Sequence, residues 1–581
     1  MLPHRSRTGL LERPQTTRST PTSTASSHRW TLLLAVGWMV QVLIRLWLAS
    51  QQPIPSLTPD ETGYLIAARL LTGGTGSDFS GYTFYQVGYS LLIAPAFCLS
   101  DDPHTVYRLV LVINALVSAA LLLLAYLALR RLSVPRTLAY VLAHATALLP
   151  AVVYYTQFAM SDAVFPVVVL GWLLLVHSWL VSGRPGYGIA AGALAGYAYA
   201  VHSRGTVIVV VHAGLLAFVL LKRRMARHHI GIATQSLATV TALAWTLDHW
   251  LQSRLYPAGI KPLGHFVAER LTSLDGLAWT FSLGAGQIWY LIVCTWGVAG
   301  IGLVALAYQA CRSTFPTTRT MVVVVLAVLA GIALASSAAL PDEHAVNNFI
   351  YGRYLACLAP VLFLAGAATI VRAPRRRLAL AFLATVSTAV IVGGIASFYA
   401  GKRLSDYPFL TFNFPEISVL VKGWSSLHLW QSTSAAILLL ALAILIVTML
   451  GKESDLLTGI VFIAINFMAL IVITYQISWP MARGTLAAAD LTAAGLRPQD
   501  RLAVDRYDLD FRIWMLHAFQ EPWHEIATFH RNDPGSLPSS ATVVVVPRKK
   551  GYSATFSWPT APREWRPVLE RDEWVAWRRG A

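Results

Sequence analysis

Charged residues are scarce in this chain, and their scarcity excludes most soluble folds. Of the 581 residues only 13% are charged and 56% are hydrophobic, whereas a soluble protein carries about 25% charged residues. The mean hydropathy of +0.56 agrees with this composition. The chain is therefore predicted to be an all-α polytopic membrane protein.

Several functional signatures are also missing from the sequence. It contains no CxxC pair, Walker loop, GxSxG motif or internal repeat, and its four cysteines are scattered, so neither a cysteine metal site nor a disulfide framework is indicated. The net charge of +17 could suggest nucleic acid as a partner. We expect no nucleic-acid binding, because most Lys and Arg stand in short clusters between apolar runs, as membrane topology requires.

About thirteen apolar runs are long enough to be transmembrane helices. Residues 1–29, rich in Arg, Ser, Thr and Pro, are expected to form a disordered basic tail in the cytoplasm. Residues 30–479 form the transmembrane domain, with an outer loop at 50–104. Within that loop, the run at 87–99 is too short to span comfortably and is expected to be re-entrant or interfacial. The expected spans are 31–49, 105–129, 137–155, 163–181, 187–203, 206–221, 231–248, 287–310, 321–340, 353–371, 378–398, 432–450 and 456–477.

The distribution of basic residues predicts the orientation in the plasma membrane. If the first span starts in the cytoplasm, the inner loops include RRLSVPR (130–136), KRRMARHH (222–229) and VRAPRRR (371–377), which are strongly basic as the positive-inside rule expects. The outer loops collect carboxylates instead. Residues 480–581 then also lie outside, so chemistry by these carboxylates takes place where ATP and nucleotide sugars are scarce.

The segment 480–581 differs in composition and is predicted to be a small extracytoplasmic α/β domain. RLAVDRYD and ATVVVVP are typical of strands, and TLAAADLTAAG is typical of a helix closed by Gly495. The DLD triplet at 508–510 resembles a metal-binding DxD motif, but three residues are a weak signal and we favour a solvated strand end. HEIATFH (524–530) has the wrong His spacing for a zinc-protease helix.

The stretch SLTPDETGY (56–64) places two acids just after the first span. Thr58 and Glu61 have the spacing of a capping box, and Pro59 occupies the favoured first helical position. We expect a helix at 59–71 that lies on the outer membrane surface, with Asp60 bordering a cavity. The alternative is that both acids only stabilise the helix start, where each is worth about 0.3–1 kcal/mol.

The order of several motifs resembles a known family. The acidic pair is followed by YTFYQVGYSLLIAPAF (82–97), the basic turn RRLSVPR and the outer turn YYTQFAMSD (154–162). Over about residues 31–400 this order resembles the GT-C glycosyltransferases, and within them the protein O-mannosyltransferase and aminoarabinose-transferase branch. The resemblance implies a polyprenyl-phosphate sugar donor and assigns the catalytic acid to Asp60, with Glu61 as the alternative. It places a second acid at Asp162, whose other interpretation is a first-turn acid capped by Ser161.

Arginines near the outer leaflet are candidates for holding the donor phosphate, since the polyprenyl phosphate leaves as an anion. Arg353 lies in NNFIYGRYLACLAP, which resembles the RYL…P segment of several GT-C enzymes, and Arg204 and Arg45 are further candidates. Contact with membrane lipid phosphate alone is the alternative explanation. We expect Asp60 and Arg353 to share one cavity, about a sugar ring plus a phosphate apart. Tyrosines expected to line this substrate cavity are Tyr64, Tyr85 and Tyr351.

The sequence thus predicts a membrane glycosyltransferase that moves a hexosyl or pentosyl group from a lipid-linked donor to an extracytoplasmic acceptor. The acceptor is a glycan, a lipid or a protein. Some family members add a divalent ion, Mg²⁺ or Mn²⁺, but no pattern in this sequence requires one. Two alternatives stay open: a lipid or sugar transporter (flippase), and a non-catalytic membrane protein of envelope assembly. The absence of repeats and of charges near the bilayer midplane speaks against a transporter.

Overall fold

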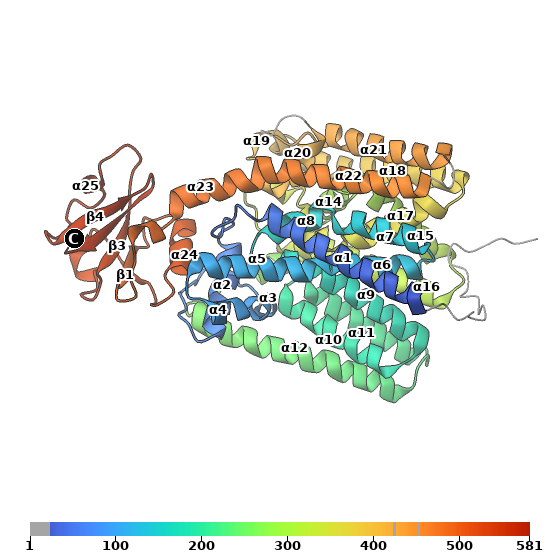
Figure 1. Ribbon diagram of the computed structural model, residues 1–581, viewed down its shortest axis with the longest axis horizontal. Coiled ribbons are helices and arrows are strands. Elements are labelled where there is room, and N and C mark those ends of the chain that lie inside the picture. The colour runs from blue at the N-terminus through green and yellow to red at the C-terminus, as the bar shows by residue number, and fades with distance from the viewer. Residues whose placement is uncertain (1–23, 422–425, 451–453, 581) are drawn as a thin grey trace, which may run out of the picture.

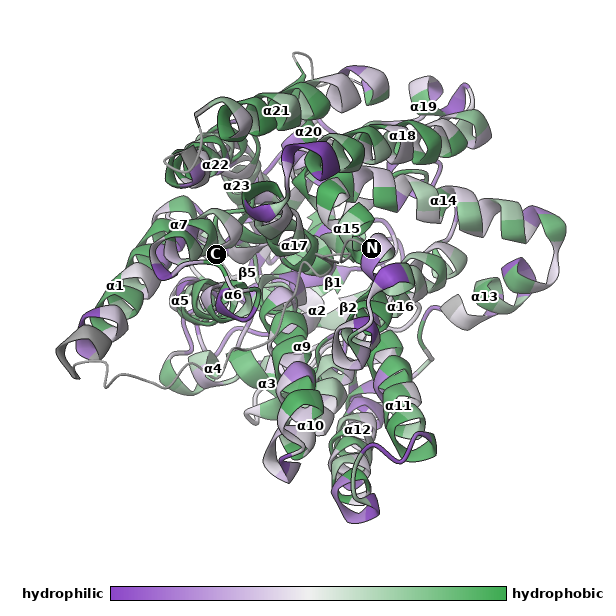
Figure 2. Ribbon diagram, turned by 90° about the vertical axis from the view of Figure 1, so that its right-hand side faces the viewer, coloured by the Kyte–Doolittle hydropathy of each residue, from purple (hydrophilic) through white to green (hydrophobic). Residues whose placement is uncertain are grey.

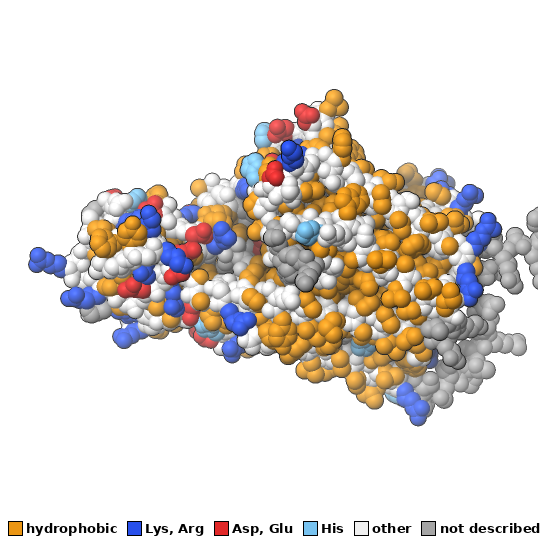
Figure 3. Space-filling model, turned by 90° about the horizontal axis from the view of Figure 1, so that it is seen from above, with side chains coloured by type: hydrophobic (Ala, Val, Ile, Leu, Met, Phe, Trp, Pro, Cys, Tyr) orange, Lys and Arg blue, Asp and Glu red, His pale blue; other side chains and the backbone are white. Residues whose placement is uncertain are grey.

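The computed structural model describes residues 24–421, 426–450 and 454–580. The predicted basic tail lies mostly outside these residues, but residues 24–29 already belong to helix α1 (Thr24–Leu48). The chain forms a long bundle of helices with a small sheet domain at one end (Figure 1). Hydrophobic side chains cover the middle of the bundle, and Lys and Arg gather at the end away from the sheet (Figure 3).

Ten helices in the described part of the chain are long and apolar enough to cross a membrane, or eleven if a pair bent by 52° at Arg136–Ala147 and Pro150–Gln157 counts as one. Apolar residues predominate along most of these helices (Figure 2), as expected where the backbone must satisfy its own hydrogen bonds. The candidate spans are α1, α5 with α6 (Pro103–Ala119, Leu121–Arg131), α9 (Phe165–Ser182), α12 (Arg227–Leu255), α14 (Leu274–Val293), α16 (Pro316–Ala339), η4 with α17 (Gly352–Leu358, Ala359–Arg372), α18 (Arg375–Ala400), α21 (Leu429–Leu450) and α22 (Ser454–Ile473), which continues through η7 and α23 (Thr474–Ser478, Trp479–Ala489).

The expected spans differ from the structure in their number and in one boundary. Helices α10 (Pro185–Val201) and α11 (Gly205–Leu221) have only 17 residues each. The run 287–310, predicted as one span, is divided between α14 and α15 (Val298–Arg312) by a turn in which Trp296 and Gly297 have φ of 56° and 81°. The short run at 87–99 forms α3 (Val87–Ile93) and α4 (Pro95–Leu99).

The C-terminal domain is a five-stranded mixed sheet in the order β2-β1-β3-β5-β4. β1 pairs in parallel with β2 and β3, while β5 is antiparallel to β3 and β4. Alternate residues of β3 face two different cores: Val543 and Val545 join the large core shared with the bundle, and Val544 and Val546 join a second core. The strands are β1 (Leu502–Asp505), β2 (Ala527–Phe529), β3 (Val543–Pro547), β4 (Trp565–Glu570) and β5 (Trp574–Arg579).

Helix α2 (Asp60–Leu71) is not the surface helix that the sequence predicts. Residues 61–69 are all buried, because α2 packs against α3 on one side and against α24 (Phe511–Gln520) of the C-terminal domain on another. It lies at the end of the bundle that meets the sheet domain (Figure 1). The apolar face of α2 is therefore covered by protein.

Candidate active site

Four charged side chains from four distant segments form one ionic cluster. Asp60 is the first residue of α2, and Asp162 lies in a 3-10 turn (Ser161–Ala163). Arg204 precedes α11, and Arg353 lies in η4. Arg353 donates to Asp60 at 2.7 Å and to Asp162 at 2.8 and 3.0 Å, and Arg204 donates to Asp162 at 2.6 Å. Two carboxylates and two guanidinium groups thus balance in charge.

The accessibility of the cluster is uneven. The side chain of Asp162 is 4% exposed and that of Arg353 is 11% exposed, but that of Asp60 is 31% exposed. Burial by itself would raise the pKa of Asp162, yet the charges of Arg353 and Arg204 outweigh it and hold that pKa below its ordinary value. Asp162 therefore stays ionised and anchors both arginines, whereas Asp60 forms the accessible rim of the cluster.

The expected separation of Asp60 and Arg353 is wrong. The two side chains are in direct contact, because Arg353 directs Nη1 to Asp60 and uses Nε and Nη2 for Asp162. Nη1 also donates to the hydroxyl of Tyr351 at 3.2 Å. The guanidinium further lies over the ring of Tyr155, 5.6 Å from its centre. Arg353 therefore orients Asp60 directly.

Tyr85 completes the surroundings of Asp60. Its hydroxyl donates to Oδ1 of Asp60 at 2.8 Å, and burial raises the pKa of Tyr85 well above its ordinary value, so the hydroxyl stays a donor. Gly63 makes this contact sterically feasible, since a Cβ there would stand 2.2 Å from the Tyr85 ring. Tyr64 packs against the same ring at 5.0 Å and pairs its hydroxyl with Ser161 at 2.8 Å, next to Asp162.

Glu61 faces away from the cluster, and the predicted capping box is absent. Its carboxylate accepts from the backbone amides of Ser56 and Leu57, at 2.7 Å each. It also accepts from the Ala159 amide at 2.7 Å and from the Tyr107 hydroxyl at 2.5 Å. Burial raises the pKa of Glu61 despite these bonds, and no part of its side chain is open to a substrate. Its contacts support a structural role rather than the alternative catalytic one.

Arg45 also lies apart from the cluster. It is 1% exposed on α1, where it donates to the backbone carbonyl and side chain of Gln41 and to the carbonyl of Ala147. These partners belong to the interior of the bundle. Such contacts do not fit the predicted role of Arg45 in holding a phosphate.

Two neighbours of the cluster carry no sequence signal. Nδ1 of His202 accepts from Nε of Arg204 at 3.3 Å, and burial lowers the pKa of His202 well below its ordinary value, so the ring stays neutral. Glu416, in the short helix α20 (Pro415–Leu420), is buried and accepts from the hydroxyl of Tyr290. Burial raises the pKa of Glu416 to about 7. Tyr290 in turn packs against Gly352, the residue before Arg353.

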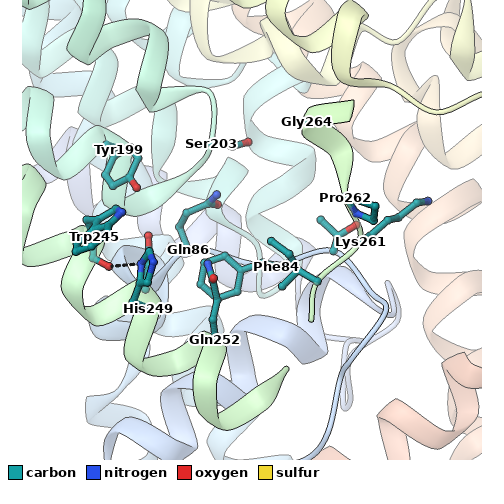
Figure 4. A pocket seen from close by; sticks show the side chains of 13 residues that line it. Phe84, Gln86, Tyr199, Ser203, Trp245, His249, Gln252, Lys261, Pro262 and Gly264 are labelled. Atoms are coloured by element: carbon teal, nitrogen blue, oxygen red, sulfur yellow. Dashed lines mark hydrogen bonds between the residues drawn. The ribbon is translucent and has the colours of Figure 1, made fainter. Parts of the chain in front are cut away.

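A cavity of about 360 Å³ is lined by sequence neighbours of the cluster but by none of its four charged residues (Figure 4). The tyrosines predicted to line a substrate cavity, Tyr64, Tyr85 and Tyr351, are not among its lining residues either. Its lining residues include Phe84 and Gln86, which flank Tyr85 in sequence, and Ser203, which precedes Arg204. Gln86, His249 and Gln252 lie close together in the view of Figure 4, beside Trp245. Lys261 also lines the cavity. The cavity thus offers hydrogen-bonding groups and one lysine beside aromatic rings.

The cluster does not fit a divalent ion. Among the described residues, no three His, Cys, Asp or Glu side chains come together as a metal site. The guanidinium of Arg353 lies between Asp60 and Asp162 and bonds to both, so a cation occupies the place that Mg²⁺ or Mn²⁺ would need. The DLD triplet holds no such site either, since Asp508 pairs with Arg531 at 3.0 Å and Asp510 caps α24.

Solved structures share the fold of nearly the whole chain. The crystal structure of ArnT from Cupriavidus metallidurans bound to undecaprenyl phosphate matches with a TM-score of 0.54 and 14% identity, over 96% of this chain and 98% of that one. The apo form of ArnT matches with a TM-score of 0.54 and 15% identity, over 95% and 98%. Arabinosyltransferase EmbB from Mycobacterium smegmatis matches with a TM-score of 0.42 and 12% identity, over 96% and 48%. No family model and no curated protein matches the chain. The likeness to ArnT shows the GT-C fold that the sequence predicts.

Proposed function

We propose that this multi-pass membrane protein is a glycosyltransferase that moves a sugar from a polyprenyl-phosphate donor to an acceptor hydroxyl on the extracytoplasmic face. The observation that carries the proposal is Asp60, an accessible carboxylate held in one orientation by Arg353 and Tyr85. A carboxylate held in this way is suited to accept a proton from a hydroxyl group. The GT-C fold, shared with an ArnT structure bound to undecaprenyl phosphate, supports the donor class.

The proposed transfer is a single displacement. The acceptor hydroxyl loses its proton to Asp60, and its oxygen bonds to the anomeric carbon of the sugar. The bond from that carbon to the phosphate oxygen breaks, and its electron pair leaves with the polyprenyl phosphate. Each oxygen of Asp60 keeps a lone pair beyond its bond to Arg353 or Tyr85, so the carboxylate can still accept.

The leaving phosphate needs a cation nearby. Arg353 is the arginine of the cluster that bonds to the accessible Asp60. We therefore assign two roles to Arg353, which are to orient Asp60 and to bind the leaving phosphate. Arg204 is less suited to this role, since it is buried and donates to Asp162 and to the carbonyls of Arg353 and Tyr354. We therefore assign Arg204 to positioning Asp162.

The distribution of basic side chains supports the orientation that we propose for the bundle in the membrane. Asp60 of the cluster begins α2, which lies at the end that carries the C-terminal domain, and basic side chains gather at the opposite end (Figures 1 and 3). By the positive-inside rule that opposite end is cytoplasmic. A reporter that works only in the cytoplasm, fused after Ala581, should then be silent. A strong signal would place the cluster on the cytoplasmic side and overturn the assignment to the extracytoplasmic face.

The experiment that tests the function uses the full chain in lipid nanodiscs. Undecaprenyl-phosphate donors carrying radiolabelled hexoses or pentoses are incubated with a membrane extract as the source of acceptor, and transferred label is counted. We expect transfer from at least one donor, and its loss in Asp60→Asn. Gly484→Ala is the matched control, since a Cβ at Gly484 meets nothing within 4 Å. If no donor of the panel is consumed, or if Asp60→Asn transfers at the wild-type rate, the proposal is wrong.

A further inference from the structure

The C-terminal domain is joined to α2 by a buried arginine. Arg69, in the last turn of α2, is 5% exposed. Its Nη1 donates to the carbonyls of Phe519 and Glu521 at 3.2 and 2.9 Å, and its Nη2 donates to that of Ala518 at 2.9 Å. These carbonyls close the C-terminal end of α24, where helix carbonyls lack intrahelical partners and the helix dipole is negative. Arg69 is thus a cap on α24 supplied by the helix that begins with Asp60.

The same domain also holds the segment that carries Tyr85. Arg69 uses Nε to bind the carbonyl of Thr75 at 2.8 Å, at the start of the loop 72–86. Farther along this loop, the ring of Phe79 lies 5.6 Å from that of Trp514, and Tyr82 stacks on Phe511 at 5.3 Å. Both partners belong to α24. Helix α24 therefore contacts the loop at Phe79 and Tyr82, a few residues before Tyr85, which bonds to Asp60.

The contacts of α24 with Arg69 and with the loop 72–86 both lead to the carboxylate of Asp60. Asp60 and Arg69 are nine residues apart on one helix, which is about 14 Å at a rise of about 1.5 Å per residue. The loop 72–86 contains Tyr85, which donates to Asp60. Asp60 is thus connected to α24 through α2, and its hydrogen-bond donor Tyr85 is connected to α24 through the loop.

We propose that the C-terminal domain is a positioning part of the transfer site, and that Arg69 is the positioning residue through which α24 fixes the geometry of Asp60 and Tyr85. The inference rests on the proposed function, because it assigns the purpose of the positioning to the transfer step. A displacement of about 1 Å from a group remote from the chemistry can cost about 10²-fold in rate. The domain then contributes to turnover without touching the substrate.

The test compares Arg69→Met with Arg69→Lys in the full chain in nanodiscs. Met removes all four hydrogen bonds and nearly keeps the length of the side chain, while Lys keeps the charge with fewer donors. We expect kcat for the donor found above to fall about 10- to 100-fold in Arg69→Met, with the KM for that donor changed less than about twofold. Arg69→Lys should restore part of kcat. Arg566→Met, on the exposed strand β4, is the matched control and should behave as the wild type.

Two further readouts separate positioning from general loss of structure. Hydrogen–deuterium exchange should become faster in peptides covering 58–66 and 80–88, and not only in α24. In a double-mutant cycle, Arg69→Met and Tyr85→Phe should be non-additive, because both act on the same carboxylate. Phe79→Leu is the second variant, since it loosens the contact with Trp514 without removing a buried charge, and it should lower kcat in the same way where Arg69→Met does not fold.

The outcomes distinguish this inference from the proposed function. If Arg69→Met and Phe79→Leu keep the wild-type kcat while Asp60→Asn is inactive, the function stands and the positioning role is wrong. If exchange rises in α24 alone, the positioning role is also wrong. If Asp60→Asn keeps transfer, the proposed function fails, and the exchange at 58–66 and 80–88 still decides whether α24 is coupled to Asp60.

Discussion

Replacing each carboxylate of the cluster by its amide should show that Asp162 contributes mainly to the stability of the protein and Asp60 mainly to turnover. Asp162 bonds to two arginines and its side chain is 4% exposed, so Asp162→Asn leaves two buried guanidinium groups without their shared anion. Asp60 bonds to one arginine, and that arginine keeps Asp162 when Asp60 is changed. The same change from carboxylate to amide is therefore made at the buried Asp162 and at the accessible Asp60.

The magnitudes follow from this asymmetry. Removing one partner of a buried ion pair costs about 3–5 kcal/mol, so Asp162→Asn should lose about that much stability. Asp60 is 31% exposed, and exposed pairs are worth up to about 1 kcal/mol, so Asp60→Asn should lose less than that. Its turnover should nonetheless fall about 10²- to 10⁴-fold, which is the usual contribution of a general base.

Reversible unfolding in mixed micelles, followed by tryptophan fluorescence, measures the first effect, and label transfer measures the second. Asp162→Asn should be the less stable variant at neutral pH. The difference should shrink in acid, since a carboxylate with a lowered pKa stabilises the fold above its ordinary pKa and loses this effect as the pH falls through the folded value. The reasoning is refuted if Asp60→Asn is as unstable as Asp162→Asn, or if it transfers sugar normally.

Two further substitutions test the surroundings of the cluster, and a third tests the exclusion of Arg45 from it. Glu416→Gln should stabilise the protein by about 3 kcal/mol above pH 7 and by nothing below pH 4.5, because the pKa of Glu416 is raised from 4.5 to about 7 and the folded state is penalised only where this carboxyl ionises. Thermal unfolding at pH 4 and pH 8 measures this effect, and equal shifts of the unfolding temperature at both pH values would contradict it. Tyr85→Phe should lower transfer about 10-fold through loss of one hydrogen bond to a charged group, and an unchanged rate would show that Tyr85 does not orient Asp60. Arg45→Met should keep transfer within about twofold; a large rise in the KM for the donor would return Arg45 to the phosphate site.

The helical part of the fold could be predicted because a membrane leaves the backbone few alternatives. An apolar run must satisfy its hydrogen bonds within itself, so runs correspond closely to helices. The break between α14 and α15 was missed, because it needs a positive φ at both Trp296 and Gly297 and only the glycine favours one. The burial of α2 could not be predicted either. Its apolar face fits lipid and protein equally well, and the helix that covers it lies about 450 residues later in the chain.

The sequence names the four residues of the ionic cluster as candidates, but their contacts could not be predicted. Asp60, Asp162 and Arg353 stand near helix ends that topology brings to one side, and the resemblance to the GT-C family makes each of them a candidate. Their direct pairing depends on packing across 293 residues of sequence. For Glu61 a local sequence pattern gave a wrong prediction, since its spacing from Thr58 predicts a capping box that the structure does not contain. A buried carboxylate needs several donors, and Tyr107 and Ala159 supply two of them from elsewhere in the fold, so tertiary bonding displaced the capping box.

The charge balance of the cluster explains why chemistry is expected at its rim. Burying isolated ions is costly, and it is tolerated where opposite charges and hydrogen bonds compensate each member. Arg204 and Asp162 meet that condition in the interior, and Arg353 carries the same network outward. Asp60 is the point at which the network reaches accessible surface, so its orientation is set by buried groups while its lone pairs stay open. A rigid, accessible carboxylate of this kind is what proton transfer from an acceptor hydroxyl requires.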